Sequence, residues 1–331
     1  MLNVGIISSW HVHAKDYVKQ LKESGKVNLI ALWDENPEKG RAQAVEWQVE
    51  FEPDYDKFIT RKDFSAVVCT SPTTMHPELL SKAAAAKKDI FTEKLLAVTT
   101  AEAEKLAEAI RSSGSIFTIS LPLRTDPAVL SVKKLVDEGA LGKITGARFR
   151  RSHSGVSDHW LPDYWFDTSL TGGGAMMDLG AHPVYIMAFL FGAPKRISGL
   201  TTRPFGTSSD ENAVGIAEFK DGIIGIMETA FVTFGVPDLL EVYGTEGSVF
   251  MQGSELKVTT KALDGLGFKT AGLKVPPHTK PAPVIQFAEA CINRSGSPEH
   301  LGLDDALVMT KMIEAIYHSD QTGKTIELFN N

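Results

Sequence analysis

The stretch LNVGIISSWHVHAKDYVKQLKESGKVNLIALWD, residues 2–34, decides the fold of the first part of this 331-residue chain. Leu2–Ile7 is a short apolar run typical of a buried strand. Apolar residues then recur at helical spacing over Ala14–Leu21, Gly25 ends that helix, and Val27–Trp33 is a second apolar run. Two strands joined by a helix of this length predict a βαβ unit and a parallel sheet.

The alternation of strands and helices continues to about residue 120. The further strands are predicted at Ala66–Thr70, Asp89–Thr92 and Ser115–Ser120. The helices between them are predicted at Pro77–Lys87 and after the capping box Thr99-x-x-Glu102. Because βαβ crossovers are right-handed, we predict a doubly wound Rossmann domain of the α/β class over residues 1–122.

The pattern changes after Pro122. A helix at Pro127–Glu138 is followed by alternating, β-rich runs joined by short turns, which indicates a large, mostly antiparallel open sheet. Residues 123–331 are therefore predicted to form an α+β domain for substrate binding and oligomerisation. We expect helices to cover one face of its sheet and a long loop to interrupt it; the helices are placed at Gly174–Phe191, Val284–Asn293 and Asp304–His318, and the loop at Lys261–Pro283.

Composition and charge exclude several classes of protein. The chain has 34 basic and 41 acidic residues, a net charge of −7, which argues against general nucleic-acid binding. No apolar run is long enough for a membrane span, and the first residues do not resemble a signal peptide. Cys69 and Cys291 have neither disulfide nor zinc spacing, so we expect two buried thiols in a cytoplasmic protein.

Parallel sheets bind ligands beyond the carboxyl ends of their strands, so the first turn is the expected nucleotide site. The turn comprises Ser8, Ser9, Trp10, His11, Val12 and His13, and it lacks the glycines of G-x-G-x-x-G. Its serines and the start of the next helix still offer hydrogen-bond donors to phosphate, which makes Ser8–Val12 candidate cofactor contacts. His11 and His13 also allow a metal site, but H-x-H spacing is a weak metal signal, and we expect no metal.

Asp34 ends the second strand, where a carboxylate accepts hydrogen bonds from a ribose diol and repels a 2′-phosphate. This position favours NAD over NADP as the cofactor. The alternative is that Asp34 merely caps the helix that starts near Pro37.

A glycine-rich segment, Gly172–His182, carries a second set of ionisable residues. Asp178 and His182 are four residues apart, which on one helix places them on the same face, where a carboxylate can hold an imidazole and raise its basicity. Pro183 complicates this geometry, because it removes a helical donor. The alternative is a buried histidine beside a capping aspartate.

Taken together, these motifs resemble the glucose–fructose oxidoreductase / inositol dehydrogenase / rhizopine catabolism family (Gfo/Idh/MocA). The resemblance covers nearly the whole chain. It rests on the Val4–Ile7 strand, Asp34, Ser71-Pro72 with His76, Glu93-Lys94, Gly139–Ile144, Gly172–His182 and Gly323–Leu328.

The resemblance implies roles for particular residues. Lys94 is expected to contact cofactor and substrate, His182 to act as acid and base, and Asp178 to orient His182. Leu95 stands where the family usually has proline. The remaining cofactor contacts are expected at Ser71, Thr73, His76 and Glu93, and the substrate contacts at Arg124, His153 and Trp165 together with Asp178 and His182.

The function predicted from these residues is hydride transfer between a nicotinamide cofactor and a carbinol or ketone carbon of a sugar, cyclitol or related polyol. Two alternatives stay open: an NAD-dependent glycosidase or lyase that oxidises its sugar transiently, and a non-catalytic ligand sensor. We expect a small-molecule partner, no nucleic acid and no membrane. The family resemblance, together with an open sheet face, also predicts a homodimer or homotetramer.

Overall fold

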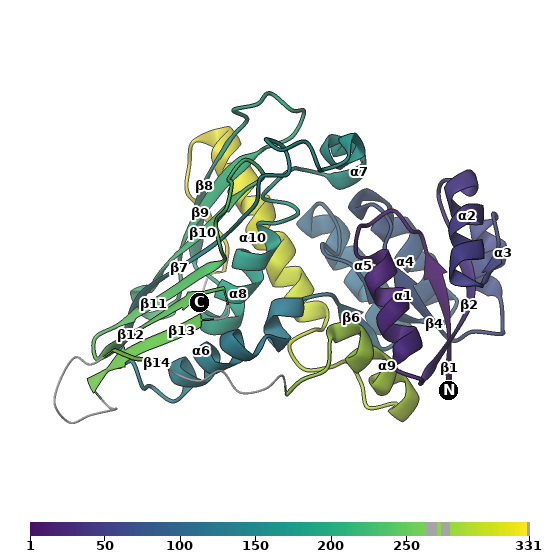
Figure 1. Cartoon of the computed structure of the whole chain (residues 1–331), viewed down its shortest axis with the longest axis horizontal. Coiled ribbons are helices and arrows are strands. Elements are labelled where there is room, and N and C mark those ends of the chain that lie inside the picture. The colour runs from purple at the N-terminus through teal and green to yellow at the C-terminus, as the bar shows by residue number, and fades with distance from the viewer. Residues whose placement is uncertain (254, 262–269, 273–278, 330–331) are drawn as a thin grey trace. The chain divides into compact units, whose positions relative to one another are not determined.

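A computed structural model describes residues 1–253, 255–261, 270–272 and 279–329, and the chain divides into two compact units (Figure 1). Unit 1 comprises Met1–Leu121 and Pro281–Thr310, and unit 2 comprises Pro122–Lys280 and Lys311–Asn331. Helix α10 (Leu303–Thr322) begins in unit 1 and ends in unit 2. No helix within the described ranges is both long and apolar enough to cross a membrane.

Unit 1 is built on a six-stranded parallel sheet in the order β3-β2-β1-β4-β5-β6, which confirms the predicted doubly wound fold. Its strands are β1 (Leu2–Ile7), β2 (Val27–Trp33), β3 (Glu50–Phe51), β4 (Ala66–Cys69), β5 (Asp89–Thr92) and β6 (Phe117–Ile119). Its helical segments before residue 121 are α1 (Ala14–Glu23), α2 (Pro37–Trp47), α3 (Tyr55–Thr60), η1 (Thr73–Met75), α4 (His76–Ala85) and α5 (Thr100–Ser113). The sequence did not predict β3 and α3, because two and six residues are too few to show a clear period.

Local sequence signals set the ends of several of these elements. Thr99 caps α5, and its side chain and that of Glu102 form the predicted capping box. Gly114 ends α5 in the left-handed region, at φ 74°. Strands β4 and β5 are buried along their whole length, as expected for a parallel sheet covered on both faces.

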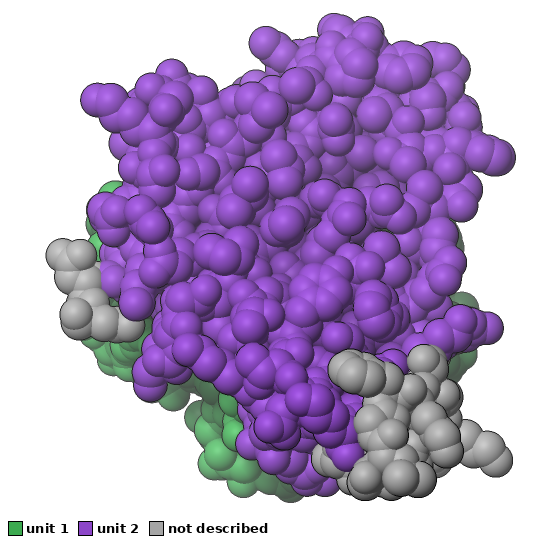
Figure 2. All heavy atoms as spheres, turned by 90° about the vertical axis from the view of Figure 1, so that its left-hand side faces the viewer, with its two compact units in different colours: residues 1–121, 281–310 green, residues 122–280, 311–331 purple. Residues whose placement is uncertain are grey.

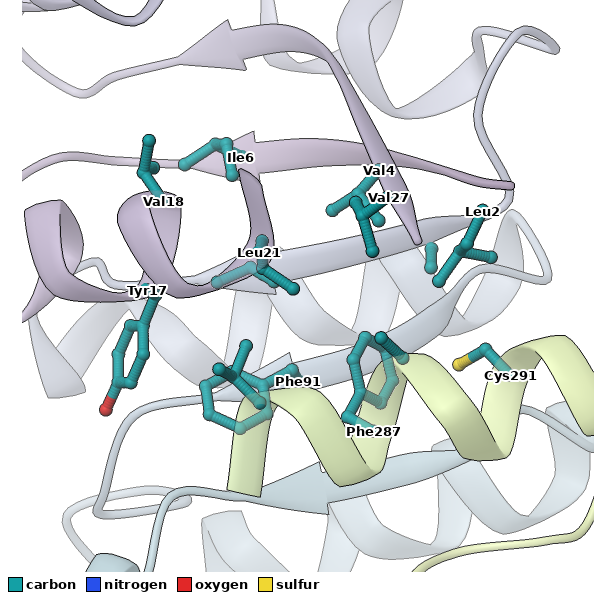
Figure 3. Close-up of a cluster of buried hydrophobic side chains, with 14 of the residues drawn as sticks. Leu2, Val4, Ile6, Tyr17, Val18, Leu21, Val27, Phe91, Phe287 and Cys291 are labelled. Atoms are coloured by element: carbon teal, nitrogen blue, oxygen red, sulfur yellow. The ribbon is translucent and has the colours of Figure 1, made fainter. Parts of the chain in front are cut away.

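Helix α9 (Pro283–Asn293) belongs to unit 1, and the prediction that it covers the second sheet is wrong. It packs against α1, β1, β5 and β6, and Figure 3 shows Phe287 and Cys291 pointing into the core of this unit. The ring centroids of Phe287 and Phe91 are 5.8 Å apart. The spacing of apolar residues in α9 predicts that one face of the helix is buried. It does not identify the surface against which that face packs, because either sheet offers a suitable apolar surface.

Unit 2 contains a nine-stranded sheet in the order β14-β13-β12-β11-β7-β10-β9-β8-β15. Only the β7–β10 pair is parallel among these neighbours, so the expectation of a mostly antiparallel sheet is confirmed. The strands are β7 (Ile144–Ser152), β8 (Arg196–Thr202), β9 (Asn212–Glu218), β10 (Ile224–Ala230), β11 (Leu239–Gly244), β12 (Gly247–Gln252), β13 (Glu255–Thr260), β14 (Thr270–Gly272) and β15 (Ile326–Glu327). Of the predicted loop Lys261–Pro283, residues 262–269 and 273–278 lie outside the described residues.

Helices cover one face of this sheet. Helix α8 (Ala181–Phe191) contacts β7 and β10, and Ile316 of α10 packs against Gly199 and Gly215, where a Cβ would lie within 2.6 Å of it. The other helical segments of unit 2 are η2 (Pro122–Thr125), α6 (Pro127–Asp137), η3 (Asp163–Phe166), α7 (Thr168–Thr171) and η4 (Lys220–Gly222). Figure 2 looks onto the opposite side of unit 2, where the described residues place no helix on the sheet.

Candidate active site

The turn between β1 and α1 contains no glycine, yet one of its residues adopts a backbone conformation that usually requires glycine. Ser8 is buried and lies in the left-handed region at φ 71°, which few non-glycine residues adopt. The N–H of Trp10 donates to Ser8 Oγ at 3.0 Å, that of His11 to the carbonyl of Thr70 at 3.0 Å, and that of His13 to His11 Nδ1 at 3.2 Å. These backbone donors bond within the turn or, in the case of His11, to the loop after β4, whereas a glycine-rich turn directs its N–H groups at phosphate.

Asp34 lies at the carboxyl end of β2 and is only 1% exposed. Its Oδ2 accepts hydrogen bonds from the backbone N–H and the hydroxyl of Ser9, at 2.8 and 2.6 Å. The cap of α2 is Asn36, whose side chain accepts from the first turn of that helix, so Asp34 does not have the alternative role of helix cap. The structure therefore joins the first turn to the end of β2 through Ser9 and Asp34.

Glu35 is a candidate site residue that the sequence did not predict. Its Oε2 is buried and has no hydrogen-bond partner among the described residues. Burial, and then the neighbouring charge of Asp34, raise the pKa of Glu35 above its usual value. The only signal in the sequence was a second acidic residue directly after the strand.

Glu93 follows β5 and is the centre of a buried cluster with the first turn. Its carboxylate accepts from His13 Nδ1 at 2.8 Å, from the Tyr17 hydroxyl, and from the N–H of Lys94 at 3.0 Å. Burial acts to raise the pKa of Glu93, but His11, His13 and Lys94 outweigh it and hold the pKa well below its usual value. Glu93 is therefore a buried anion whose charge is balanced by its neighbours.

The same cluster is the one group among the described residues with possible metal-ligand geometry. One ligand atom each from His11, His13 and Glu93 lies within 4.8 Å of the others. Both Glu93 oxygens already accept hydrogen bonds from the protein, and His11 Nδ1 accepts one from the backbone. Each of these three acceptor atoms therefore already has a donor in the protein.

Lys94 is 5% exposed and is joined to Leu95 by a cis peptide bond, at the position where the sequence departs from the expected proline. The ring of His76 lies behind this loop. Its Nδ1 is 2.6 Å from the carbonyl of Leu95, and its Nε2 is 3.2 Å from the carbonyl of Ser71. His76 therefore links the loops that follow β4 and β5, and burial lowers the pKa of its imidazole. Thr73 is buried at the start of η1 on the first of these loops.

In unit 2 the glycine-rich segment is a series of turns, and only its end is helical. The predicted helix Gly174–Phe191 is wrong over residues 174–180, because α8 begins at Ala181. Asp210 accepts from the N–H groups of Gly174 and Met176, both at 2.8 Å, and these bonds take the place of a helical ladder. Pro183 falls in the first turn of α8, where its missing N–H is harmless.

Asp178 contacts Trp165, and His182 contacts Tyr185. Asp178 lies in the turn before α8, and its Oδ2 accepts from Trp165 Nε1 at 3.1 Å. His182 is 5% exposed in the first turn of α8, and its Nδ1 lies 2.7 Å from the hydroxyl of Tyr185. The expected shared helix face is therefore wrong, since Asp178 is not part of the helix. Tyr185 was not foreseen.

Two predicted substrate residues lie beside this segment. His153 stacks on Phe231 with ring centroids 4.9 Å apart, and its pKa is lowered by burial, against the opposing effect of Asp178. Arg124 is buried, and its guanidinium donates to the backbone carbonyl of Tyr185 at 3.0 Å. The structure thus associates Trp165 and His153 with Asp178, and Arg124 with α8.

Comparison with known families agrees with this geometry. Residues 2–121 match the oxidoreductase family with an NAD-binding Rossmann fold, and residues 129–250 match the GFO/IDH/MocA C-terminal domain. The chain belongs to the Gfo/Idh/MocA family. It is an NAD-binding oxidoreductase of that family, as its motifs had suggested.

Relatives with curated activities are similar over much of the chain. Scyllo-inositol 2-dehydrogenase (NAD(+)) of Bacillus subtilis (strain 168) is 29% identical over 252 residues, which are 73% of this chain and 70% of that protein. Levoglucosan dehydrogenase of Pseudarthrobacter phenanthrenivorans is 26% identical over 249 residues, which are 66% of this chain and 64% of that protein. A solved structure of levoglucosan dehydrogenase with NADH and levoglucosan superposes with a TM-score of 0.86 at 23% identity, covering 99% of both chains.

The residues at the end of β2 fit the NAD cofactor of this family. Two acidic residues follow the strand, the buried Asp34 and the partly buried Glu35, and the buried Oε2 of Glu35 has no donor among the described residues. Ribose hydroxyls are donors of the kind that such an oxygen requires. The fit is less direct at the first turn, because five of its N–H groups, those of Ser8–His11 and of His13, donate within the protein.

Proposed function

We propose that this oxidoreductase transfers a hydride between NAD and a carbinol carbon of a sugar, cyclitol or related polyol. The observation that carries the proposal is the presence, on this family's fold, of a buried lysine after β5 and a buried histidine at the start of α8, Lys94 and His182. Burying such groups is costly, and they persist where a reaction uses them. The named activities of the two relatives, on an inositol and on an anhydrosugar, support this substrate class.

The cofactor residues are proposed from unit 1. Asp34 and Glu35 would accept the ribose hydroxyls, and their negative charge favours NAD over the 2′-phosphate of NADP. The turn Ser8–Val12 would face the diphosphate, and Ser71, Thr73 and Lys94 the nicotinamide half. Because its ring nitrogens contact two carbonyls, His76 would act indirectly, by holding the loops that carry Ser71 and Lys94.

The protein supplies the proton chemistry. Bound NAD provides hydride transfer to and from the carbinol carbon. His182 takes the substrate hydroxyl proton during oxidation and returns it during reduction. Lys94 donates a hydrogen bond to the same oxygen and stabilises its partial negative charge. Asp178, together with Trp165 and His153, would bind a neighbouring hydroxyl.

The first test measures cofactor binding and turnover. Titration calorimetry should show NAD⁺ binding more tightly than NADP⁺, and a panel of inositols, hexoses, anhydrosugars and amino sugars should contain a substrate that yields NADH. Failure of both cofactors to bind below about millimolar concentration would contradict the proposal. Product formation without NADH accumulation would instead identify the transient-redox glycosidase or lyase.

The second test assigns the residues. Lys94→Ala and His182→Ala should each lower kcat by about 100-fold or more, because each removes a group that acts on the reacting oxygen. Lys105→Ala and His318→Ala, at exposed helical positions, are the matched controls and should retain turnover. Near-normal kcat in both site variants would refute the assigned roles.

We also propose a cytoplasmic homodimer or homotetramer that associates through the helix-free face of the unit 2 sheet. Several apolar side chains of the strands of this sheet are exposed: Leu200, Ile216, Ile224 and Phe250. Exposed apolar side chains on a sheet favour association with another surface. A monomer in size-exclusion chromatography with light scattering would contradict it.

A further inference from the structure

We infer that Tyr185 is the positioning residue for His182: its hydroxyl holds the Nδ1 side of the imidazole, so that Nε2 is the nitrogen that exchanges the substrate proton. This inference rests on the proposed function, because it concerns the proton role given there to His182. The observation behind it is the 2.7 Å distance between His182 Nδ1 and the Tyr185 hydroxyl oxygen.

Tyr185 is itself held firmly. The residue is fully buried, the N–H of Leu123 donates to its hydroxyl oxygen at 3.1 Å, and Arg124 donates to its backbone carbonyl at 3.0 Å. The Arg124 guanidinium also lies over the Tyr185 ring, 5.7 Å from its centroid. A hydroxyl fixed at both its ring and its oxygen presents one defined position to the imidazole, whereas a flexible partner does not.

The proton positions follow from the chemistry of the two rings. For Nε2 to accept a proton, neutral His182 must carry its own proton on Nδ1, and after accepting it both nitrogens are protonated. In both states Nδ1–H needs an acceptor, and the Tyr185 oxygen provides one. A phenolic oxygen accepts from two donors, so it can serve Nδ1–H and the Leu123 N–H together. The positioning role of Tyr185 therefore requires its oxygen to accept from Nδ1–H and its own hydroxyl proton to point away from the imidazole.

This assignment separates two tasks that were both expected of Asp178. Asp178 precedes α8 and accepts a hydrogen bond from Trp165, a predicted substrate residue. We assign the binding of a substrate hydroxyl to this carboxylate, beside Trp165. The orientation of the imidazole is assigned to Tyr185, which lies three residues after His182 on the same helix and contacts its Nδ1.

The direct test is the tautomer of His182 in the protein without substrate. Imidazole nitrogen NMR of the ¹⁵N-histidine-labelled full chain, with the His182→Gln spectrum to assign the signals, should show His182 protonated on Nδ1 when the ring is neutral. In Tyr185→Phe the ring loses this acceptor, and the Nδ1–H population should fall. A Tyr185→Phe spectrum in which the His182 signals are unchanged would overturn the inference, whatever the activity of the protein.

The kinetic test uses a matched pair of buried tyrosines. Tyr185→Phe should lower kcat by about 10- to 100-fold with a smaller change in KM, since the base is misoriented but substrate contacts remain. Tyr55→Phe removes a buried hydroxyl that donates to the Leu79 carbonyl in unit 1 and should retain kcat. Equal kcat values for Tyr185→Phe and Tyr55→Phe would overturn the positioning role. If no polyol is turned over at all, the proposed function fails, while the NMR result still decides the inference.

Discussion

Asp210→Asn should loosen the segment that carries Asp178 and His182. Both oxygens of the Asp210 carboxylate accept hydrogen bonds. Oδ1 accepts from the Gly174 N–H and the Tyr317 hydroxyl, and Oδ2 accepts from the Met176 N–H, each at 2.8 Å. An asparagine keeps the shape but offers only one acceptor oxygen. Its NH₂ group must therefore face at least one of these donors.

The number of hydrogen bonds lost determines the expected loss of stability. The less costly orientation places the NH₂ toward the Met176 N–H and loses one hydrogen bond to a charged acceptor, which contributes about 1.5–3 kcal/mol. We expect Asp210→Asn to lower the free energy of unfolding by about 2–3 kcal/mol. Displacement of the reacting groups by about 1 Å should also lower kcat, by roughly 10- to 100-fold.

The assay combines guanidinium denaturation with steady-state turnover of the best substrate. Asp221→Asn is the control, because Asp221 is exposed and sits at φ 59°, a conformation that asparagine adopts as readily as aspartate. The reasoning is refuted if Asp210→Asn stays within about 0.5 kcal/mol of the wild type and keeps its kcat, since exposed substitutions alone fall in that range.

Three further predictions concern packing and charge. Gly174→Ala would place a Cβ 2.1 Å from the Asp210 carbonyl oxygen, so it should destabilise the protein by about 3 kcal/mol, whereas Gly302→Ala, with no atom closer than 4.0 Å, should be near neutral in thermal denaturation. Phe287→Ala should cost about 3–5 kcal/mol because the ring is fully buried in the unit 1 core, and Ile292→Ala, half-exposed on the same helix, should cost far less; similar losses would argue against the placement of α9. The pKa of Glu93 is lower in the folded protein than its unfolded value of 4.5, so ionised Glu93 stabilises the fold above pH 4.5, and this stabilisation is lost as the pH falls toward the folded pKa. Below pH 4.5 the free energy of unfolding of the wild type should therefore fall more steeply with pH than that of Glu93→Gln. Parallel plots of unfolding free energy against pH for the two proteins would contradict this.

The amino-acid sequence by itself determined the features that depend on short-range pattern. Apolar runs of strand length separated by helical periods placed β1, β2 and β5 at the residues found, and Thr99 with Glu102 marked the start of α5. Since parallel strands bring their carboxyl ends to one edge, the strand boundaries also placed Asp34 and Lys94 correctly at loop positions. These inferences need only neighbours along the chain.

Only the tertiary structure decided which distant groups meet. Asp210 lies 36 residues from Gly174, and its bonds turn a stretch with helical spacing into a series of turns, so Asp178 never joins the helix of His182. The position of α9 was also decided by tertiary structure, because its apolar face packs against the sheet of unit 1 and not against the sheet of unit 2. A hydrogen-bond acceptor or an apolar face specifies the kind of partner it needs, but the path of the intervening chain determines which partner is within reach.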